Sequence, residues 1–262
     1  MKLGFIGAGN MARAIINGWS SQGQKAEIYL HSAHKASYEP YAKEHGLHAC
    51  TSVSKADIIF LAVKPLVLAE VLHEIKETVQ AKKPVVVSMV TGVSIAEIAD
   101  LLELTPKELE VIRIMPNVNA EIAAGMTALN ASPAVTETNF LRVKGLFEMI
   151  GQTEILPEKD FSTFVALAGS SPAYVYFFID AMSRAGVKYG LKKDQATKIA
   201  AQAVLGSAQK VLADQKTPMQ LVDDVCSPGG TTIAGLLAME EAGFMTAVIK
   251  GMDATINKDQ GK

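Results

Sequence analysis

The chain has 262 residues, of which 49% are hydrophobic and 20% are charged, and its formal net charge is −2. This length and apolar content suffice for one large domain or two modest ones, each with its own core. A charge so near neutral leaves no basic field that would gather nucleic acid or an anionic membrane, so neither is expected as a partner.

Neither a targeting signal nor a metal-binding pattern is visible in the sequence. The N-terminus reaches a glycine turn at Gly7 before a signal-type apolar segment can form, and no stretch approaches membrane-spanning length. Cys50 and Cys226 form neither a CxxC pair nor a metal spacing with the five histidines. We therefore expect a cytoplasmic protein with reduced thiols and no metal site.

Residues 1–157 alternate short apolar runs with amphipathic stretches, which is the pattern of βαβ units packed as a parallel sheet with helices on both faces. The predicted strands are residues 3–6, 27–30, 58–63, 85–89 and 111–115, with two further candidates at residues 126–129 and 153–156. A capping box formed by Ser94 and Glu97 predicts the start of the helix after the fourth strand. The first domain is therefore expected to be a doubly wound α/β domain over residues 1–157.

After Pro157 the strand signals vanish, and residues 158–262 predict an all-helical domain. Ser171 and Pro172 have the residue types of an N-cap and a first helical residue, and the run that follows, residues 174–182, is apolar on nearly every side. Small apolar residues at helical spacing over residues 196–211 predict a second helix. A capping box at Thr217 predicts a third helix, and a fourth is expected near Thr231. So short a half forms only a small core alone, so we expect it to bury its apolar surface against a second copy.

The sequence Gly7-Ala8-Gly9-Asn10-Met11-Ala12 follows the first predicted strand and opens a helix. This is the G-x-G-x-x-A form of the dinucleotide-binding fingerprint of Rossmann-type domains. Gly7 allows a tight turn, Gly9 lets the backbone approach a pyrophosphate, and Ala12 keeps the helix close to the strand. Free N–H groups at the helix start would face the phosphates. The first five residues of the motif are therefore candidate cofactor ligands.

The end of the second predicted strand bears on the choice between NAD and NADP, because an acidic residue there binds the ribose 2′-hydroxyl and repels a 2′-phosphate. No acid follows Leu30; the loop contains His31, Ser32, His34 and Lys35. The alternative is a polar surface loop without a ligand. The sequence favours NADPH, with NADH also possible, and Ser32 is the candidate ligand for the phosphate.

A second candidate cofactor segment, Ala62-Val63-Lys64-Pro65, closes the third predicted strand. The carboxyl ends of strands line the ligand crevice of a doubly wound sheet, so its backbone is expected to touch the cofactor. The alternative is that Pro65 merely starts a helix and that Lys64 is a solvated charge.

Proton donors suited to carbonyl reduction are missing from the helical half. All five histidines precede residue 74, and no lysine lies between Lys159 and Lys188. Tyr189 and Lys193 have the spacing of a Tyr-x-x-x-Lys pair, but Gly190 places them across a helix end. The missing proton donors favour an imine over a carbonyl as the substrate, because an imine nitrogen is basic enough to carry a proton before the hydride arrives.

A glycine-rich loop, Cys226-Ser227-Pro228-Gly229-Gly230-Thr231-Thr232, leads into a predicted helix. Exposed amides and hydroxyls at such a helix start form a compact carboxylate nest. Two or three charge-assisted hydrogen bonds of about 1.5 to 3 kcal/mol each would hold a carboxylate without an arginine. The alternative is an ordinary helix cap.

These motifs, together with Arg113-Ile114-Met115-Pro116-Asn117 and Gly169-Ser170-Ser171-Pro172-Ala173-Tyr174, resemble in their order the pyrroline-5-carboxylate reductase family over essentially the whole chain. The resemblance implies NADPH or NADH as hydride donor, a cyclic imino acid as substrate and L-proline as product. It also implies a homodimer, or a higher oligomer of dimers, whose site takes cofactor from one chain and helices from both.

The resemblance assigns roles to individual residues. Ser227, Gly229, Gly230, Thr231 and Thr232 form the substrate-carboxylate loop, and the Thr232 hydroxyl, near the ring nitrogen, is the catalytic candidate. The cofactor candidates implied along the nicotinamide half are Val63, Lys64, Pro65 and Asn117.

Three residues depart from the family pattern. Ala168 and Ser171 stand where the family commonly has threonine and glycine, and Cys226 replaces a threonine or serine. These changes leave the carboxylate loop intact and bear on ring fit and turnover. Two alternatives therefore stay open: a reductase of another cyclic imino acid, and a non-catalytic NADPH-binding paralogue.

Overall fold

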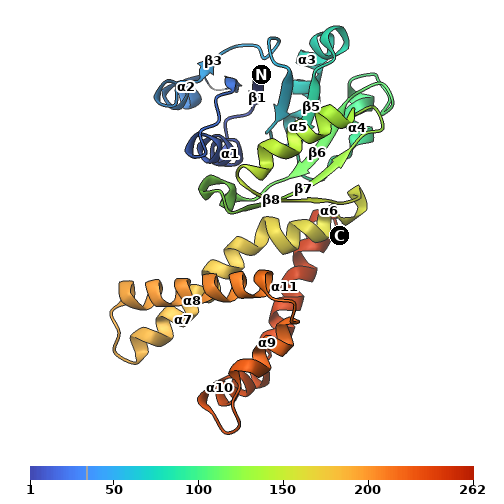
Figure 1. Cartoon of the computed structure of the whole chain (residues 1–262). Coiled ribbons are helices and arrows are strands. Elements are labelled where there is room, and N and C mark those ends of the chain that lie inside the picture. Colours follow the sequence, from blue (N-terminus) through green and yellow to red (C-terminus); the bar gives the residue numbers. More distant parts are fainter. Residues whose placement is uncertain (34) are drawn as a thin grey trace. The chain divides into compact units, whose positions relative to one another are not determined.

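The computed structural model describes residues 1–33 and 35–262, and so His34, one of the two predicted imidazoles of the phosphate loop, lies outside the described residues. The chain divides into two compact units (Figure 1). The first unit comprises residues 1–170 and 255–262, and the second comprises residues 171–254.

The first unit is built on an eight-stranded sheet with the order β3-β2-β1-β4-β5-β6-β7-β8 (Figure 1). The strands are β1 (Lys2–Ile6), β2 (Glu27–His31), β3 (His48–Ala49), β4 (Ile58–Leu61), β5 (Val85–Ser88), β6 (Val111–Met115), β7 (Gly125–Ala131) and β8 (Gly151–Ile155). The chain runs outward from β1 to β3 and then returns to β4 on the other side of β1, so the strand order reverses between β1 and β4. The doubly wound fold and all seven predicted strands are confirmed, whereas β3 was not predicted.

One part of the sheet differs from the predicted parallel arrangement. β7 pairs with β6 antiparallel, and β8 pairs with β7 in parallel. A parallel crossover needs a dozen or more residues and usually a helix. The connection from β6 to β7 contains only a short 3-10 helix, η2 (Val118–Ile122), so the chain turns back instead of crossing over.

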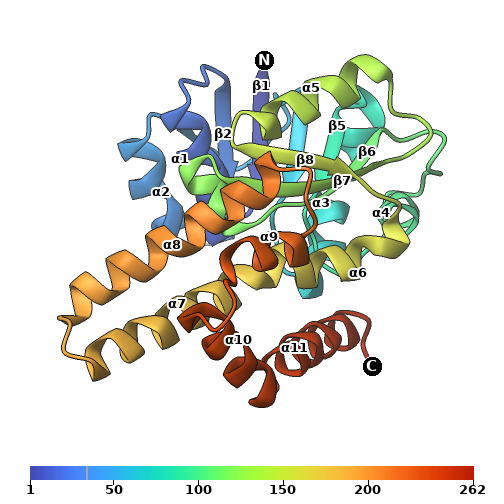
Figure 2. The same cartoon turned by 60° about the horizontal axis from the view of Figure 1, so that its bottom comes forward.

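Helices cover both faces of the sheet, each over its own apolar core. One face packs against α1 (Asn10–Ser21), α2 (Lys35–Glu44) and α5 (Glu137–Glu148). The other packs against α3 (Leu68–Lys82) and α4 (Ile95–Leu101), and Figure 2 shows α3 and α5 on opposite sides of the sheet. Trp19 lies at the centre of the first core, where its Nε1 donates to the Leu146 carbonyl at 2.7 Å.

The predicted capping boxes are both present. At the start of α4, Glu97 N donates to Ser94 Oγ at 3.2 Å and Ser94 N donates to Glu97 Oε2 at 2.7 Å. Thr217 and Gln220 make the reciprocal pair at the start of α9 (Pro218–Val225). The Ser94 hydroxyl also donates to Glu97 Oε2 at 2.7 Å, and this bond, together with the one from Ser94 N, holds the pKa of the Glu97 carboxyl below its usual value.

The C-terminal part of the chain is helical, as predicted, but its first helix does not begin at Ser171. The chain is helical without a break from Glu158 to Lys188. This run consists of η3 (Glu158–Asp160), α6 (Phe161–Phe164), the π-helical turn η4 (Val165–Ser170) and α7 (Ser171–Lys188). Ser171 is therefore inside a helix, and the prediction that it is an N-cap is wrong. Pro172, which has no N–H to donate, is accommodated just after a wider π-helical turn and not at a helix end.

Three predicted helices and one unpredicted helix complete the chain. They are α8 (Lys193–Ala213), α9, α10 (Thr231–Glu241) and α11 (Phe244–Asp259), of which α11 was not predicted. α7 and α8 approach closely, because a Cβ on Gly186 would lie 2.9 Å from the Ala196 Cβ. Ser183 Oγ and Thr197 Oγ1 form a hydrogen bond of 2.8 Å between the same two helices.

The run Glu158–Lys188 has 31 residues and an 18-residue window of mean hydropathy 1.3, so by length and composition it is able to cross a membrane. The prediction that no stretch approaches this length is wrong. The bent pair formed by α10 and α11 meets the same criterion only when both helices are counted together.

Within one chain, α7 is not buried in the way that its apolar composition suggests. Phe177 is 78% exposed and Tyr176 is 58% exposed. An apolar cavity of about 440 Å³ lies in the second unit, lined by Tyr174, Phe177, Phe178, Met239, Phe244 and Val248 among others. An exposed surface of this kind marks an interaction site.

Candidate active site

The glycine turn after β1 has the geometry that a dinucleotide requires. Gly7 has a φ of +106°, and its N–H donates to the His31 carbonyl at 2.8 Å. A Cβ on Gly7 would lie 2.2 Å from the Ala62 carbonyl oxygen, so the close approach of β1 and β4 depends on this glycine. A Cβ on Gly9 would meet no protein atom within 4 Å. The protein itself therefore does not require a glycine at position 9, whereas a phosphate approaching the backbone would.

The N-terminus of α1 is open to an anion. Its N-cap is Gly9, no side chain caps it, and no acidic residue lies in its first turn. Asn10 is exposed, and Ala8 and Met11 are partly exposed. Unpaired N–H groups and the positive end of the helix dipole suit a pyrophosphate at this position.

The Arg13 side chain stabilises the glycine turn at residues 7–9. Its Nε donates to the Ala8 carbonyl at 2.9 Å, and its Nη2 donates to the Ser37 carbonyl at 2.9 Å. The guanidinium also lies over the Tyr41 ring, 4.8 Å from the ring centre. Burial raises the pKa of Tyr41 to about 12, so its hydroxyl stays protonated and donates to Asn17 Oδ1 at 2.7 Å.

The end of β2 meets the loop that follows β3. His31 Nδ1 and the Tyr38 hydroxyl both lie within hydrogen-bonding distance of the Cys50 carbonyl, at 3.1 and 3.0 Å. Ser32 is partly exposed, and Lys35 pairs with Glu39 on the surface of α2 at 3.6 Å. Burial raises the pKa of the Cys50 thiol, which keeps it protonated beside the crevice.

A cavity of about 310 Å³ opens at the carboxyl ends of β1, β2 and β3. Among its lining residues are Ile6, His31, Thr51, Ser52 and Glu74. Thr51 and Ser52 place hydroxyls in this crevice but were not predicted as site residues. Their only signal in the sequence is a pair of hydroxyls after a two-residue strand, and topology alone brings them beside His31.

The segment after β4 lies beside the glycine turn. Ala62 N donates to the Ile6 carbonyl at 2.8 Å, while Lys64 and Pro65 are exposed. Pro65 begins the 3-10 helix η1 (Pro65–Val67), as the alternative interpretation of this segment expected. The segment can both start a helix and line the cofactor crevice, because η1 begins at the carboxyl edge of the sheet.

Asn117 is 5% exposed and is bound at both ends of its amide. Its Nδ2 donates to the Ala168 carbonyl at 3.0 Å, and its Oδ1 accepts from Met126 N at 3.3 Å. The side chain therefore joins the end of β6 to β7 and to the π-helical turn η4.

The predicted carboxylate loop lies in the second unit and forms a tight turn. Gly230 N donates to the Ser227 carbonyl at 3.0 Å, and Gly229 has a φ of +69° after Pro228. Proline followed by a glycine of positive φ is typical of a type II turn. A Cβ on Gly230 would lie 2.6 Å from Ser227 Oγ and 3.0 Å from the Ser227 carbonyl oxygen, so the turn leaves little room for a side chain there. α10 begins at once with Thr231 and Thr232, both exposed, and has no side-chain cap and no acid in its first turn.

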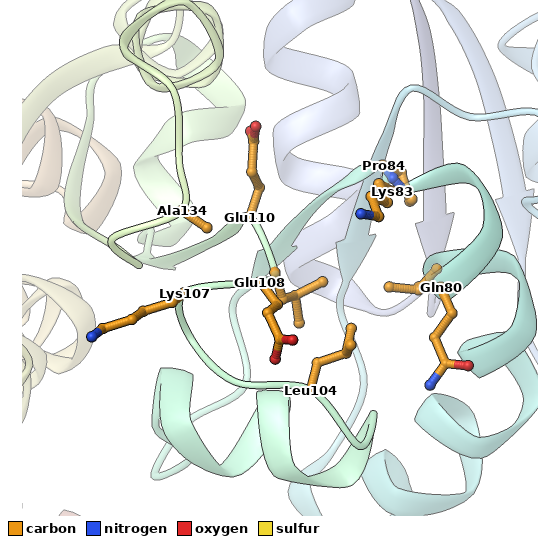
Figure 3. Close-up of a pocket in the computed structure, with 10 residues that line it drawn as sticks. Gln80, Lys83, Pro84, Leu104, Lys107, Glu108, Glu110 and Ala134 are labelled. Atoms are coloured by element: carbon orange, nitrogen blue, oxygen red, sulfur yellow. The ribbon is translucent and has the colours of Figure 1, made fainter.

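A larger cavity, of about 560 Å³, lies at the amino-terminal ends of β5 and β6 (Figure 3). It is lined in part by Gln80, Lys83, Leu104 and Glu108. Ligands of doubly wound sheets bind outside the carboxyl ends of the strands, so this cavity lies at the wrong edge to belong to the nucleotide site. Within residues 1–33 and 35–262, no cluster of histidine, cysteine and acidic side chains is placed to hold a metal ion.

Two family models match separate parts of the chain. Residues 2–92 match the model described as NADP oxidoreductase, coenzyme F420-dependent. Residues 158–262 match the model described as pyrroline-5-carboxylate reductase dimerisation. The exposed apolar side chains of α7 therefore lie in a domain whose family forms dimers.

A relative from Escherichia coli, named pyrroline-5-carboxylate reductase, is 40% identical over 265 residues, which cover 99% of this chain and 97% of the relative. The chain belongs to the pyrroline-5-carboxylate reductase family. A zebrafish family member, pyrroline-5-carboxylate reductase 3, is 37% identical and covers 97% of this chain and 88% of its own length.

Solved structures of the family share this architecture. The 1-pyrroline-5-carboxylate reductase of Streptococcus pyogenes is 36% identical, with a TM-score of 0.87 over 100% of this chain and 99% of that chain. The Plasmodium falciparum pyrroline carboxylate reductase with NADP bound is 29% identical, with a TM-score of 0.88 over 100% of this chain and 97% of that chain. The resemblance seen in the sequence is thus confirmed over the full length.

Proposed function

We propose that this chain reduces 1-pyrroline-5-carboxylate to L-proline with NADPH, the last step of proline biosynthesis. The carrying observation is the near-complete match to reductases of this name, at 40% identity in the E. coli relative. The two uncapped helix N-termini behind glycine turns, at α1 and α10, supply one anion site suited to a pyrophosphate and one suited to a carboxylate.

When bound, the nicotinamide supplies a hydride for the C=N carbon of the ring. The protein's part is to bind, orient and supply one hydrogen bond. In this proposal the loop residues Ser227, Gly229, Gly230 and Thr231 hold the substrate carboxylate, and the Thr232 hydroxyl contacts the ring nitrogen. The imine nitrogen takes its proton from water before the hydride arrives, so hydride addition to the carbon of the iminium gives the amine directly.

The proposed cofactor ligands fall in three groups. Gly7, Ala8, Gly9, Asn10 and Met11 would face the pyrophosphate, and Ser32 the 2′-phosphate; Ala62, Val63, Lys64, Pro65 and the Asn117 region would line the nicotinamide half. The open space beside Gly9 supports a phosphate there, because no protein atom fills it. NADPH is proposed over NADH, since His31 and Ser32 end β2 without an acid.

We further propose a homodimer, or an oligomer of dimers, joined through residues 158–262, with residues 1–157 as the cofactor domain. The dimerisation model that matches residues 158–262 and the exposed aromatic side chains of α7 support this assembly. The chain's net charge of −2 supports an enzyme without nucleic-acid or membrane partners, and we propose that it works in the cytoplasm.

The test is turnover with defined substrates. Purified protein should oxidise NADPH when 1-pyrroline-5-carboxylate is added, and L-proline should accumulate in equal amount. Absence of turnover with either nicotinamide, in protein shown to bind the cofactor, would rule out this function and leave a non-catalytic binding role.

A second candidate substrate is a six-membered cyclic imino acid, favoured by Ala168 and Ser171 at positions next to the proposed ring pocket. The kcat/KM values for five- and six-membered imino acids decide between the two. A higher value for the larger ring would replace the first proposal.

A further inference from the structure

The π-helical turn η4 (Val165–Ser170) lies within the run Glu158–Lys188 and ends two residues before the helical Pro172. In an α-helix, Pro172 would offer no N–H to the Ala168 carbonyl, and its ring would clash with that carbonyl. π-helical turns are rare in proteins, and those that occur are often found at functional sites. The wider turn therefore accommodates the proline, and the Ala168 carbonyl lies where the α-helical donor four residues on is missing.

The Ala168 carbonyl accepts a hydrogen bond from a side chain of a distant segment. Ala168 is 9% exposed, and its oxygen accepts from Asn117 Nδ2 at 3.0 Å. Asn117 is itself held from the other side, because its Oδ1 accepts from Met126 N at 3.3 Å. The amide of Asn117 thus supplies the Ala168 carbonyl with a hydrogen bond in place of the N–H that Pro172 lacks.

We propose that Asn117 is a positioning residue whose side chain holds the turn η4 in its π-helical form, and thereby sets the position of Gly169, Ser170 and Ser171 at the substrate. The proposal rests on the proposed function, in which Ala168 and Ser171 flank the ring pocket. The side chain of Asn117 acts through the turn and not by contact with the reacting atoms.

Asn117→Ala is the first test. A misplacement of about 1 Å costs up to roughly 100-fold in rate, so kcat/KM for 1-pyrroline-5-carboxylate should fall about 10- to 100-fold. The Kd for NADPH separates this role from a direct contact with the cofactor, because a loss of NADPH affinity that accounts for the whole fall in kcat/KM would overturn the proposal. A purely structural role predicts a lower melting temperature with parent kcat/KM in the folded fraction.

Asn130→Ala is the matched control. Asn130 Nδ2 donates to the Leu156 carbonyl at 2.7 Å, so this variant also removes an asparagine-to-carbonyl hydrogen bond from the first unit. It should lower the melting temperature while keeping the parent kcat/KM. An equal fall of kcat/KM in both variants would mean general destabilisation and would overturn the proposal.

Pro172→Ala tests the same turn without removing Asn117. The new N–H at position 172 can donate to the Ala168 carbonyl, and the turn should relax toward an α-helix. The expected result is a higher melting temperature together with a lower kcat/KM, a combination that unfolding cannot produce. In the double variant with Asn117→Ala, the melting temperature should recover toward the parent while kcat/KM stays low. Recovery of both would overturn the positioning role.

Amide exchange at Gly169 and Ser170 provides a readout that does not depend on turnover. Exchange should be faster in Asn117→Ala and unchanged in Asn130→Ala. If the parent shows no imine reduction, the proposed function fails, and exchange still decides whether Asn117 holds the turn. Parent-like exchange in Asn117→Ala, or faster exchange with parent kcat/KM, would overturn the inference.

Discussion

The α-carbon of Gly7 faces the carbonyl oxygen of Ala62 so closely that a Cβ at position 7 would lie 2.2 Å from that oxygen. The two residues follow β1 and β4, the neighbouring strands at which the strand order reverses. The crevice for the cofactor therefore depends on a contact that only glycine permits.

Separate alanine substitutions at Gly7 and Gly9 should have different effects, the first on the stability of the fold and the second on the binding of NADPH. Gly7→Ala combines a clash with a positive φ and should lower the free energy of unfolding by about 2 to 4 kcal/mol. Gly9→Ala should keep the parent melting temperature and lose NADPH affinity, because the added methyl group meets no protein atom and enters only the space that we propose for the pyrophosphate. Calorimetry and NADPH titration check both variants. Parent affinity in Gly9→Ala would place the phosphates elsewhere.

Ser32→Asp should shift the cofactor preference toward NADH. A carboxylate at the end of β2 would repel a 2′-phosphate, and like-charge contacts are costly enough to change the ratio of the two kcat/KM values at least about 10-fold. Ser32→Ala, which removes only the hydroxyl, is the control and should change the ratio less. An unaltered ratio in Ser32→Asp would show that this loop does not read the phosphate.

Thr232→Ala tests the proposed contact with the ring nitrogen. Losing a hydrogen bond of about 1.5 to 3 kcal/mol corresponds to roughly a 10- to 150-fold fall in kcat/KM. Thr232→Ser keeps the hydroxyl and should retain most activity, and neither variant should change the Kd for NADPH. Parent-like activity in the alanine variant would remove Thr232 from the catalytic role and leave it as part of the start of α10.

Phe177→Arg should weaken the dimer. The side chain is 78% exposed in the single chain and lines the apolar cavity of the second unit, so an arginine there would bring an unpaired charge into a buried interface. Light scattering should show a shift toward monomer, with a loss of activity. Leu141→Arg, on α5 in the first unit and also exposed, is the control and should stay dimeric. A fully active monomer would contradict a site shared between chains.

We expect the ionised Asp180 carboxylate to stabilise the folded protein, and we expect acid to remove this contribution. Hydrogen bonds from Lys193 and Arg184 lower the pKa of the Asp180 carboxyl to about 2. A lowered folded-state pKa stabilises the protein above the unfolded value, so this contribution should be lost as pH falls from about 4 toward 2. The melting temperature of Asp180→Asn should fall less than that of the parent across this window. High salt should shrink the difference, since the pair is exposed.

The sequence predicted most of the sheet because β1, β2, β4, β5 and β6 are built on short apolar runs bounded by turns. β3 was not predicted because His48 and Ala49 form a strand too short to show the alternation of apolar and polar residues that is typical of strands. The reversal at β7 was not predicted either, since strand direction depends on the length of the connection and not on the strand's own residues. For the same reason Thr51 and Ser52 gave no usable signal, as only the sheet brings them next to His31.

The helical half was predicted well where capping residues are explicit, as at Thr217. Proline after serine is usually read as a helix start, but at Ser171 the chain was already helical, because Asn117 supplies from another strand end the hydrogen bond that makes an internal proline tolerable. Such a donor, fifty-one residues away in the chain, cannot be seen in a local pattern. The predicted site residues of the carboxylate loop and the cofactor crevice stay predictions until variants are measured.

The last helix returns to the first unit, where Ser162 Oγ donates to Asp259 Oδ2 at 2.6 Å across 97 positions of the chain. On the ribosome, the strands of the cofactor domain are complete once Ile155 has emerged, whereas Asp259 is among the last residues to be made. Domains fold as they are synthesised, N-terminal first. The order of synthesis therefore allows the proposed dinucleotide site to form on the nascent chain, whereas the contact between Ser162 and Asp259 forms only after the finished chain is released.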